Sequence, residues 1–195
     1  MAYSHTVDGD RVHASRRFTQ LPMTGKFALM SKCAVALRAL ETGDMQFIEH
    51  LYATSRAGEM SHSGWPAEQI ERFLHMQFNA QHTYYQQHFT DAEFYIVERA
   101  GEPVGRLYMR FGVTCAVLID IALLPAYQRR GIGTALLENM LHRADNLQLP
   151  VELSVEPYNP AQQLYQRFGF EVINQAGVYL RMRREAPAHP SRMPS

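Results

Sequence analysis

The residues best suited to chemistry lie in the segment Asp120–Leu137, DIALLPAYQRRGIGTALL, where an apolar run leads into a loop and then into a helix. Gly131 and Gly133 lack side chains, so the backbone N–H groups of this loop can approach an anion closely. The helix that follows carries about half a positive charge at its N-terminus, and Arg129 and Arg130 stand beside it. The pattern indicates a phosphate or pyrophosphate cradle. A tight strand-to-helix turn with solvent-facing arginines is the structural alternative.

Two common phosphate-binding loops do not fit this segment. A P-loop requires Gly-x-x-x-x-Gly-Lys-Ser/Thr, but the chain has only two lysines, Lys26 and Lys32, and both precede the segment by far. A dinucleotide-binding loop requires Gly-x-Gly-x-x-Gly/Ala, whereas Gly131-x-Gly133 is followed by Leu136. A nucleotide-binding protein therefore stays open only if the second motif, described next, is accidental.

The second motif is the segment from Asn159 to Phe170, NPAQQLYQRFGF. Together with Gln128-x-x-Gly131-x-Gly133 after an apolar strand, it resembles the two ordered motifs of the GNAT N-acetyltransferase superfamily. The first of these is that family's acyl-CoA pyrophosphate loop. The resemblance covers roughly residues 33–185.

The resemblance implies that acetyl-CoA is the co-substrate. Its pantetheine arm is expected in a split of the sheet, where it pairs with backbone near Ile121 and Leu123. Asn159 would contact this arm, cap its own helix, or do both. The pyrophosphate is expected on the loop and on the first helical turn. The residues implied there are Gln128, Arg129, Arg130, Gly131, Ile132, Gly133 and Thr134.

The resemblance also implies direct attack of a primary amine on the thioester, which needs a base for the amine and a proton donor for the departing thiolate. Tyr165 matches the position of the family's general acid, although its apolar helix face also suits a core tyrosine. Asp120 stands alone in an apolar run and must be paired or exposed at a cleft. It is a candidate base or a structural hydrogen-bond acceptor, and the weaker candidates for the base are Glu59, Glu98 and Glu156.

The elements that position these residues follow from hydrophobic periodicity. Apolar runs predict strands over residues 33–40, 94–97, 104–111, 115–124, 150–156 and 178–182. Helical spacing predicts a first helix that Thr42 or Asp44 caps and whose buried face includes Phe47, Ile48, Leu51 and Tyr52. Further helices are predicted over about 66–85, 131–142 and 160–168, and Gly169 is expected to end the last of them. This order, read with the resemblance, predicts a mixed α/β, single-domain GNAT-like fold: a twisted mixed sheet of about six to seven strands flanked by about four helices.

The domain organisation follows from composition along the chain. Residues 1–32 are polar without sustained periodicity and are expected to be an N-terminal arm or an expression-derived extension. Residues 33–185 are expected to form the GNAT-like domain, and residues 186–195 a disordered tail. Within the domain, Arg106 and Arg110 share one face of a predicted strand, toward an anionic acceptor or toward water.

Overall composition narrows the function classes. The chain has 195 residues, of which 46% are hydrophobic, and a chain of this size can bury about 70% of its surface in one core. Its 19 basic and 19 acidic residues cancel, so no charge field predicts nucleic-acid binding. The two cysteines have no zinc-site spacing, and the histidines lack an acidic third ligand, so no metal is expected.

The expected partners and location complete the prediction. The absence of a long apolar stretch or a leader predicts a cytoplasmic protein that does not bind membranes. The partner is a small-molecule or peptide amine, and the chain is a monomer or a homodimer. The alternative function is a catalytically silent acyl-CoA-binding module, which turnover with a panel of amines would distinguish.

Overall fold

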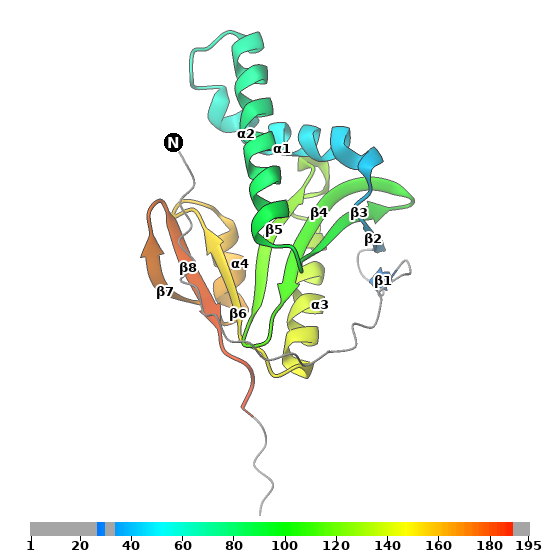
Figure 1. Ribbon diagram of the computed structural model, residues 1–195, viewed down its shortest axis with the longest axis vertical. Helices are drawn as coiled ribbons and strands as arrows, with labels where there is room; N and C mark the ends of the chain where they lie inside the picture. Colours follow the sequence, from blue (N-terminus) through cyan, green and yellow to red (C-terminus); the bar gives the residue numbers. More distant parts are fainter. Residues whose placement is uncertain (1–26, 30–33, 189–195) are drawn as a thin grey trace, which may run out of the picture.

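A single mixed sheet organises the chain in the computed structural model, which describes residues 27–29 and 34–188 (Figure 1). The strands are β1 Phe27–Leu29, β2 Val35–Ala39, β3 Glu93–Arg99, β4 Glu102–Phe111, β5 Ala116–Leu123, β6 Val151–Val155, β7 Glu171–Ala176 and β8 Tyr179–Arg184. The helices are α1 Met45–Met60, α2 Ala67–His88, α3 Ile132–Asn146 and α4 Ala161–Arg167. Most of the predicted N-terminal arm and C-terminal tail lies outside the described residues.

The strand order is β1-β2-β3-β4-β5-β6-β8-β7. Strands β5 and β6 are parallel, and each other neighbouring pair of this sheet is antiparallel. The β5–β6 pairing covers only Ala116–Leu118 against Val151–Leu153, although β5 continues to Leu123. The sheet therefore divides into two halves that separate beyond Leu118.

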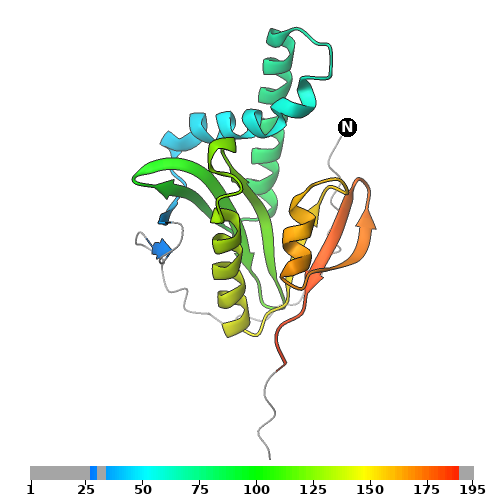
Figure 2. The same cartoon turned by 180° about the vertical axis from the view of Figure 1, so that it is seen from behind.

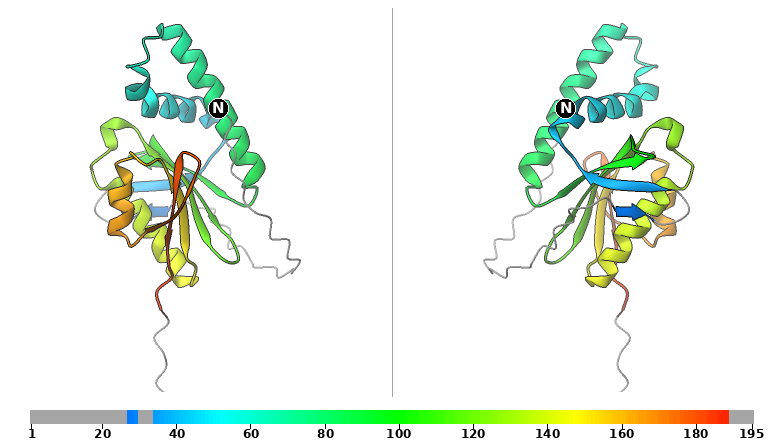
Figure 3. Two further views of the ribbon diagram at one scale, coloured as in Figure 1. Left: turned by 90° about the vertical axis from the view of Figure 1, so that its left-hand side faces the viewer. Right: turned by 90° about the vertical axis from the view of Figure 1, so that its right-hand side faces the viewer.

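The helices cover both faces of the sheet, as the opposite views show (Figures 1 and 2). Helices α1 and α2 lie on one face, where Ile48, Leu74 and Phe78 pack with Ile96 of β3. Helices α3 and α4 lie on the other face, and α3 buries the apolar stripe that its spacing predicts. The side views show α1 crossing the end of the sheet while part of α2 extends beyond it (Figure 3).

The predicted mixed α/β fold with four helices is confirmed. The described sheet has eight strands, because β1 and β7 join the six that the sequence pattern indicated. Strand β7 is exposed along its whole length, so no buried face imposes an alternating pattern on its sequence. Helix α1 begins at Met45, directly after Asp44, one of the two predicted caps, and ends at Met60.

Candidate active site

The split between β5 and β6 exposes backbone groups of β5. The N–H of Leu124 donates to the carbonyl of Val104 on β4 at 2.9 Å. Backbone groups alternate sides along a strand, so those of Leu123 and Ile121 point away from β4 and toward the split. This is the arrangement that an extended pantetheine chain needs in order to pair with β5 as a strand would.

The N-terminus of α3 lies directly after β5 and carries backbone donors without a cap. Gly131 is the N-cap residue in a left-handed conformation, with φ at +80°, and no side chain caps the helix. The first intrahelical bond runs from Ala135 N–H to Gly131 O, so the N–H groups of Ile132, Gly133 and Thr134 have no helical acceptor. A Cβ placed on Gly133 would meet no described atom within 4 Å. Donors and open space together fit a pyrophosphate.

The three residues before Gly131 have different environments. The Gln128 side chain donates to the carbonyl of Leu123 at 2.8 Å, so it braces the loop against the end of β5. Arg129 is exposed and holds a left-handed φ of +56°. The Arg130 guanidinium lies 5.8 Å from the ring centre of Tyr127. Both arginines lie at the surface beside the helix N-terminus, where their charges reach an anion bound to it.

The second motif forms α4 and its two ends. The Asn159 side-chain oxygen accepts a hydrogen bond at 2.9 Å from the N–H of Ala161, the first residue of α4, so Asn159 satisfies one of the free N–H groups at this helix start. The N-cap position itself belongs to Pro160, one residue later than predicted. Gly169 ends the helix with φ at +81°, as predicted. These two ends fix a short helix in which Tyr165 faces the interior.

The Tyr165 side chain is a buried, protonated phenol. It is only 6% exposed, and its ring packs edge-on against Phe170 at 5.9 Å. Burial, together with the charge of Asp120, raises the pKa of Tyr165 to about 12. The hydroxyl is therefore protonated at neutral pH, and no residue in the described part of the chain holds it by a hydrogen bond.

Asp120 lies next to an irregularity in β5. Tyr108 pairs with Asp120 and Met109 with Leu118, so Ile119 forms a bulge, a feature that redirects neighbouring side chains. The Asp120 carboxylate lies 2.5 Å from the guanidinium of Arg106. Arg106 is only 4% exposed, so the prediction that it faces an acceptor or water is wrong. That prediction failed because α2 covers this face of β4.

The sequence model described as the acetyltransferase (GNAT) family matches residues 59–170, more than half of the chain. That range includes the loop before α3 and the whole of α4. The chain belongs to the GNAT acetyltransferase family. No curated protein sequence matches it.

Solved structures agree with the GNAT fold. The PaiA N-acetyltransferase from Thermoplasma acidophilum, in complex with coenzyme A, is 22% identical with a TM-score of 0.59, over 80% of this chain and 99% of that one. The ribosomal-protein-S18-alanine N-acetyltransferase from Escherichia coli is 18% identical with a TM-score of 0.56, over 83% and 99%. A GNAT family acetyltransferase from Elizabethkingia anophelis with acetyl-CoA bound is 17% identical with a TM-score of 0.51, over 77% and 97%.

The weaker candidate bases of this GNAT protein are held in ion pairs. Glu98 pairs with Arg38 at 2.6 Å, and the same arginine binds Asp44 at the start of α1. Glu59 and Glu156 share Arg56 at 3.0 and 3.1 Å. Asp120 is also held in an ion pair, with Arg106, but its charge additionally acts on the pKa of Tyr165. The structure thus brings Asp120 and Tyr165 into one electrostatic environment.

Within residues 27–29 and 34–188, no three or more His, Cys, Asp or Glu side chains gather in a way that could hold a metal ion. No helix in the same part of the chain combines the length and apolar character that crossing a membrane requires.

Proposed function

We propose that this GNAT-family protein transfers the acetyl group of acetyl-CoA to a primary amine by direct attack in a ternary complex, in the cytoplasm. The observation that carries the proposal is the uncapped N-terminus of α3, which follows β5 where β5 parts from β6. Tyr165 of α4 adds to it, because its phenol lies within electrostatic reach of Asp120 on β5. Coenzyme A and acetyl-CoA in two structural relatives support this choice of co-substrate.

Binding of acetyl-CoA would use backbone more than side chains. The N–H groups of Ile132, Gly133 and Thr134 would hold the pyrophosphate, and the helix dipole would add to their attraction. The backbone of Ile121 and Leu123 would pair with the pantetheine arm. Gln128 and Asn159 would act mainly by fixing the loop and α4, because both side chains already bond to backbone groups.

The transfer forms one C–N bond and breaks one C–S bond. The amine nitrogen attacks the thioester carbon, the thiolate leaves, and the proton lost by the amine balances the charge of the thiolate. Asp120 is the carboxylate proposed to accept a proton from the amine. Tyr165 is proposed to act on the departing sulfur.

The pKa of Tyr165 defines what this residue can do. A thiol has a pKa of about 8.5, so a phenol with a pKa of about 12 is the weaker acid by roughly 3.5 units, or about 5 kcal/mol. Full proton transfer from Tyr165 to the thiolate would therefore be uphill. A hydrogen bond from the phenol to the developing negative charge on sulfur would stabilise the transition state without that cost.

Release of free CoA thiol in the presence of amines tests the proposal. Wild-type protein should release CoA from acetyl-CoA with at least one member of a panel of alkylamines, amino-acid amides and short peptides. The acceptor should gain the mass of one acetyl group. Tight acetyl-CoA binding with no release above hydrolysis for any amine would contradict the proposal and favour the silent acyl-CoA-binding module.

A further inference from the structure

A buried polar cluster lies beneath α2, on the face of the sheet opposite α3 and α4. It contains Gln81 and His82 from α2, Arg106 and Tyr108 from β4, and Asp120 from β5. One terminal nitrogen of Arg106, Nη2, lies 3.0 Å from the Gln81 side-chain oxygen and 2.5 Å from Asp120 Oδ2. The guanidinium thus connects the helix α2 to the carboxylate of β5.

Several polar atoms of this cluster lack hydrogen-bond partners. Four of them are buried and form no hydrogen bond with a described residue: His82 Nδ1, Arg106 Nε, the Tyr108 hydroxyl and Asp120 Oδ2. Asp120 Oδ2 contacts Arg106 as an ion pair. A buried guanidinium with unmet donors contributes little to stability compared with well-packed apolar side chains. Its presence therefore calls for a reason other than stability.

Arg106 supplies the positive charge of this cluster, because His82 and Tyr108 are neutral at neutral pH. Burial and the Arg106 charge both lower the pKa of His82, which keeps its ring neutral at neutral pH. Burial raises the pKa of Tyr108 to about 12, so its hydroxyl is neutral as well. The carboxylate of Asp120 is therefore balanced by Arg106 rather than by the other titratable groups around it.

The orientation of Asp120 follows from its two oxygens. Oδ2 is buried against Arg106, yet the side chain is 17% exposed, so part of it reaches the open side of the cluster. The same carboxylate acts on the pKa of Tyr165. We propose that Arg106 is a positioning residue, which holds Asp120 with one oxygen inward and the other available to the acceptor amine. This inference rests on the proposed function.

A double-mutant cycle tests whether Arg106 acts through Asp120. We expect Arg106→Met to lower kcat on the order of 10²-fold, the effect of misplacing a reacting group, and to leave the Kd of acetyl-CoA unchanged. In an Asp120→Asn background, the same change should alter kcat less than about twofold, because no carboxylate remains to be positioned. Equal losses in both backgrounds would overturn the inference.

Two further variants separate positioning from folding. Arg106→Met leaves the Asp120 carboxylate without its ion-pair partner, so this variant can fail to fold. Arg106→Lys keeps the positive charge and can replace Arg106→Met in the double-mutant cycle. We expect it to lower kcat less than Arg106→Met does.

Arg110→Met is the matched control. Arg110 lies two residues along β4, but its Nε is buried and its guanidinium lies over the Phe89 ring, so it faces neither an acceptor nor Asp120. The control variant should keep kcat within about twofold; a loss as large as that of Arg106→Met would overturn the inference.

The outcomes distinguish this inference from the proposed function. Wild-type turnover together with equal losses in both backgrounds removes only the positioning role of Arg106. If the wild type turns over and Asp120→Asn does not lower kcat, then Asp120 is not the base, and Arg106 has no carboxylate to position. Lack of wild-type turnover with every amine contradicts the proposed function and overturns the inference as well.

Discussion

Arg129 combines an unfavourable backbone conformation with a place beside the proposed anion site. Its φ of +56° lies in the left-handed region, which costs a residue with a Cβ roughly 1–2 kcal/mol. The turn into Gly131 requires this conformation, because the chain must reverse between the end of β5 and the start of α3. Strain of this kind often accompanies functional loops.

Replacing Arg129 tests that strain. Arg129→Gly and Arg129→Ala remove the same charge, but only glycine adopts a positive φ without steric cost. We expect the glycine variant to be about 1 kcal/mol more stable than the alanine variant in urea unfolding. This order is the reverse of the one found in helices. An alanine variant as stable as the glycine variant would show that the loop is unstrained.

Gly133 allows the cradle to be tested without disturbing the fold. Because a Cβ there meets no described atom within 4 Å, Gly133→Val should change the free energy of unfolding by less than about 1 kcal/mol. A bound pyrophosphate would meet the added side chain, so the Kd of acetyl-CoA should rise at least tenfold, about 1.4 kcal/mol, in calorimetry.

The matched control for Gly133 is Gly58→Val in α1, where a Cβ also meets no described atom within 4 Å. This variant should bind acetyl-CoA as the wild type does, because α1 lies on the other face of the sheet. Unchanged affinity in a folded Gly133→Val variant would remove the loop from the acetyl-CoA site.

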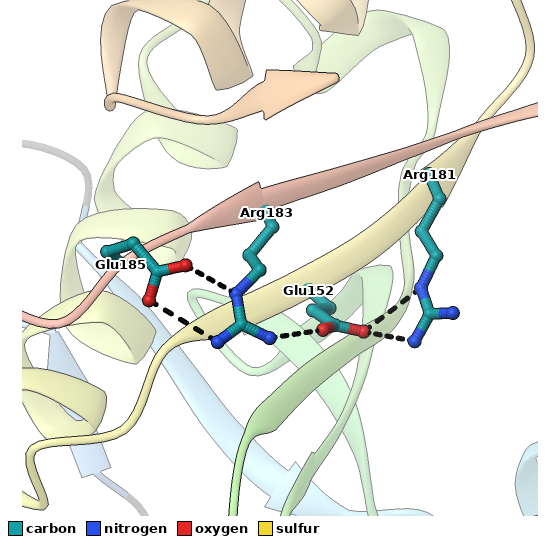
Figure 4. A network of polar contacts seen from close by, with 4 residues as sticks. All are labelled: Glu152, Arg181, Arg183 and Glu185. Carbon is teal, nitrogen blue, oxygen red and sulfur yellow. Dashed lines mark hydrogen bonds and ion pairs between the residues drawn. The ribbon is translucent and has the colours of Figure 1, made fainter. Parts of the chain in front are cut away.

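The pairing of β6 with β8 depends on a charged network on the face opposite α4 (Figure 4). Glu152 accepts hydrogen bonds from Arg181 and Arg183, and Arg183 also binds Glu185 at 2.6 Å. Burial raises the pKa of Glu152, but the hydrogen bonds and charges of the two arginines outweigh it and hold this pKa below its ordinary value. The network thus stabilises one side of the split at neutral pH.

Glu152→Gln should destabilise the protein by about 1–3 kcal/mol at pH 7, since it weakens charged hydrogen bonds at partly exposed arginines. The depressed pKa stabilises the fold above the unfolded value of 4.5, and this contribution disappears as the pH falls through the folded value. The difference between variant and wild type in urea unfolding should therefore shrink below pH 4.5. A pH-independent difference would assign the effect to packing.

The sequence predicted the elements that a buried face or a turn residue specifies. The apolar stripe of α3, the cap at Asn159 and the stop at Gly169 are local, and each was readable from neighbouring residues. Strand β7 was missed because an exposed edge strand needs no pattern. The ion pair of Asp120 with Arg106 depends on the bulge at Ile119 and on the face of the sheet that α2 covers. The alternation of residues within one strand predicts neither of these, so the sequence did not predict the ion pair.

Across the molecule, the proposed active centre draws on both halves of the divided sheet. Asp120 and the loop before α3 follow from β5, whereas Tyr165 sits on α4 after β6. Acetyl-CoA lying in the split would contact both halves, so binding should stabilise them together by about 2.7 kcal/mol at a hundredfold excess over Kd. Thermal unfolding with increasing acetyl-CoA measures this. A midpoint that does not move would show that acetyl-CoA does not bind the folded protein.

The Tyr165→Phe variant tests most directly whether this arrangement catalyses acetyl transfer. Phenylalanine keeps the ring and its contact with Phe170 and removes only a hydroxyl that has no described hydrogen-bond partner. The measurement compares steady-state CoA release with calorimetric acetyl-CoA binding for both proteins. We predict that kcat and kcat/KM fall together by roughly 10²-fold while the Kd stays unchanged. Equal kcat in both proteins would contradict the catalytic role of Tyr165, and with it the central claim.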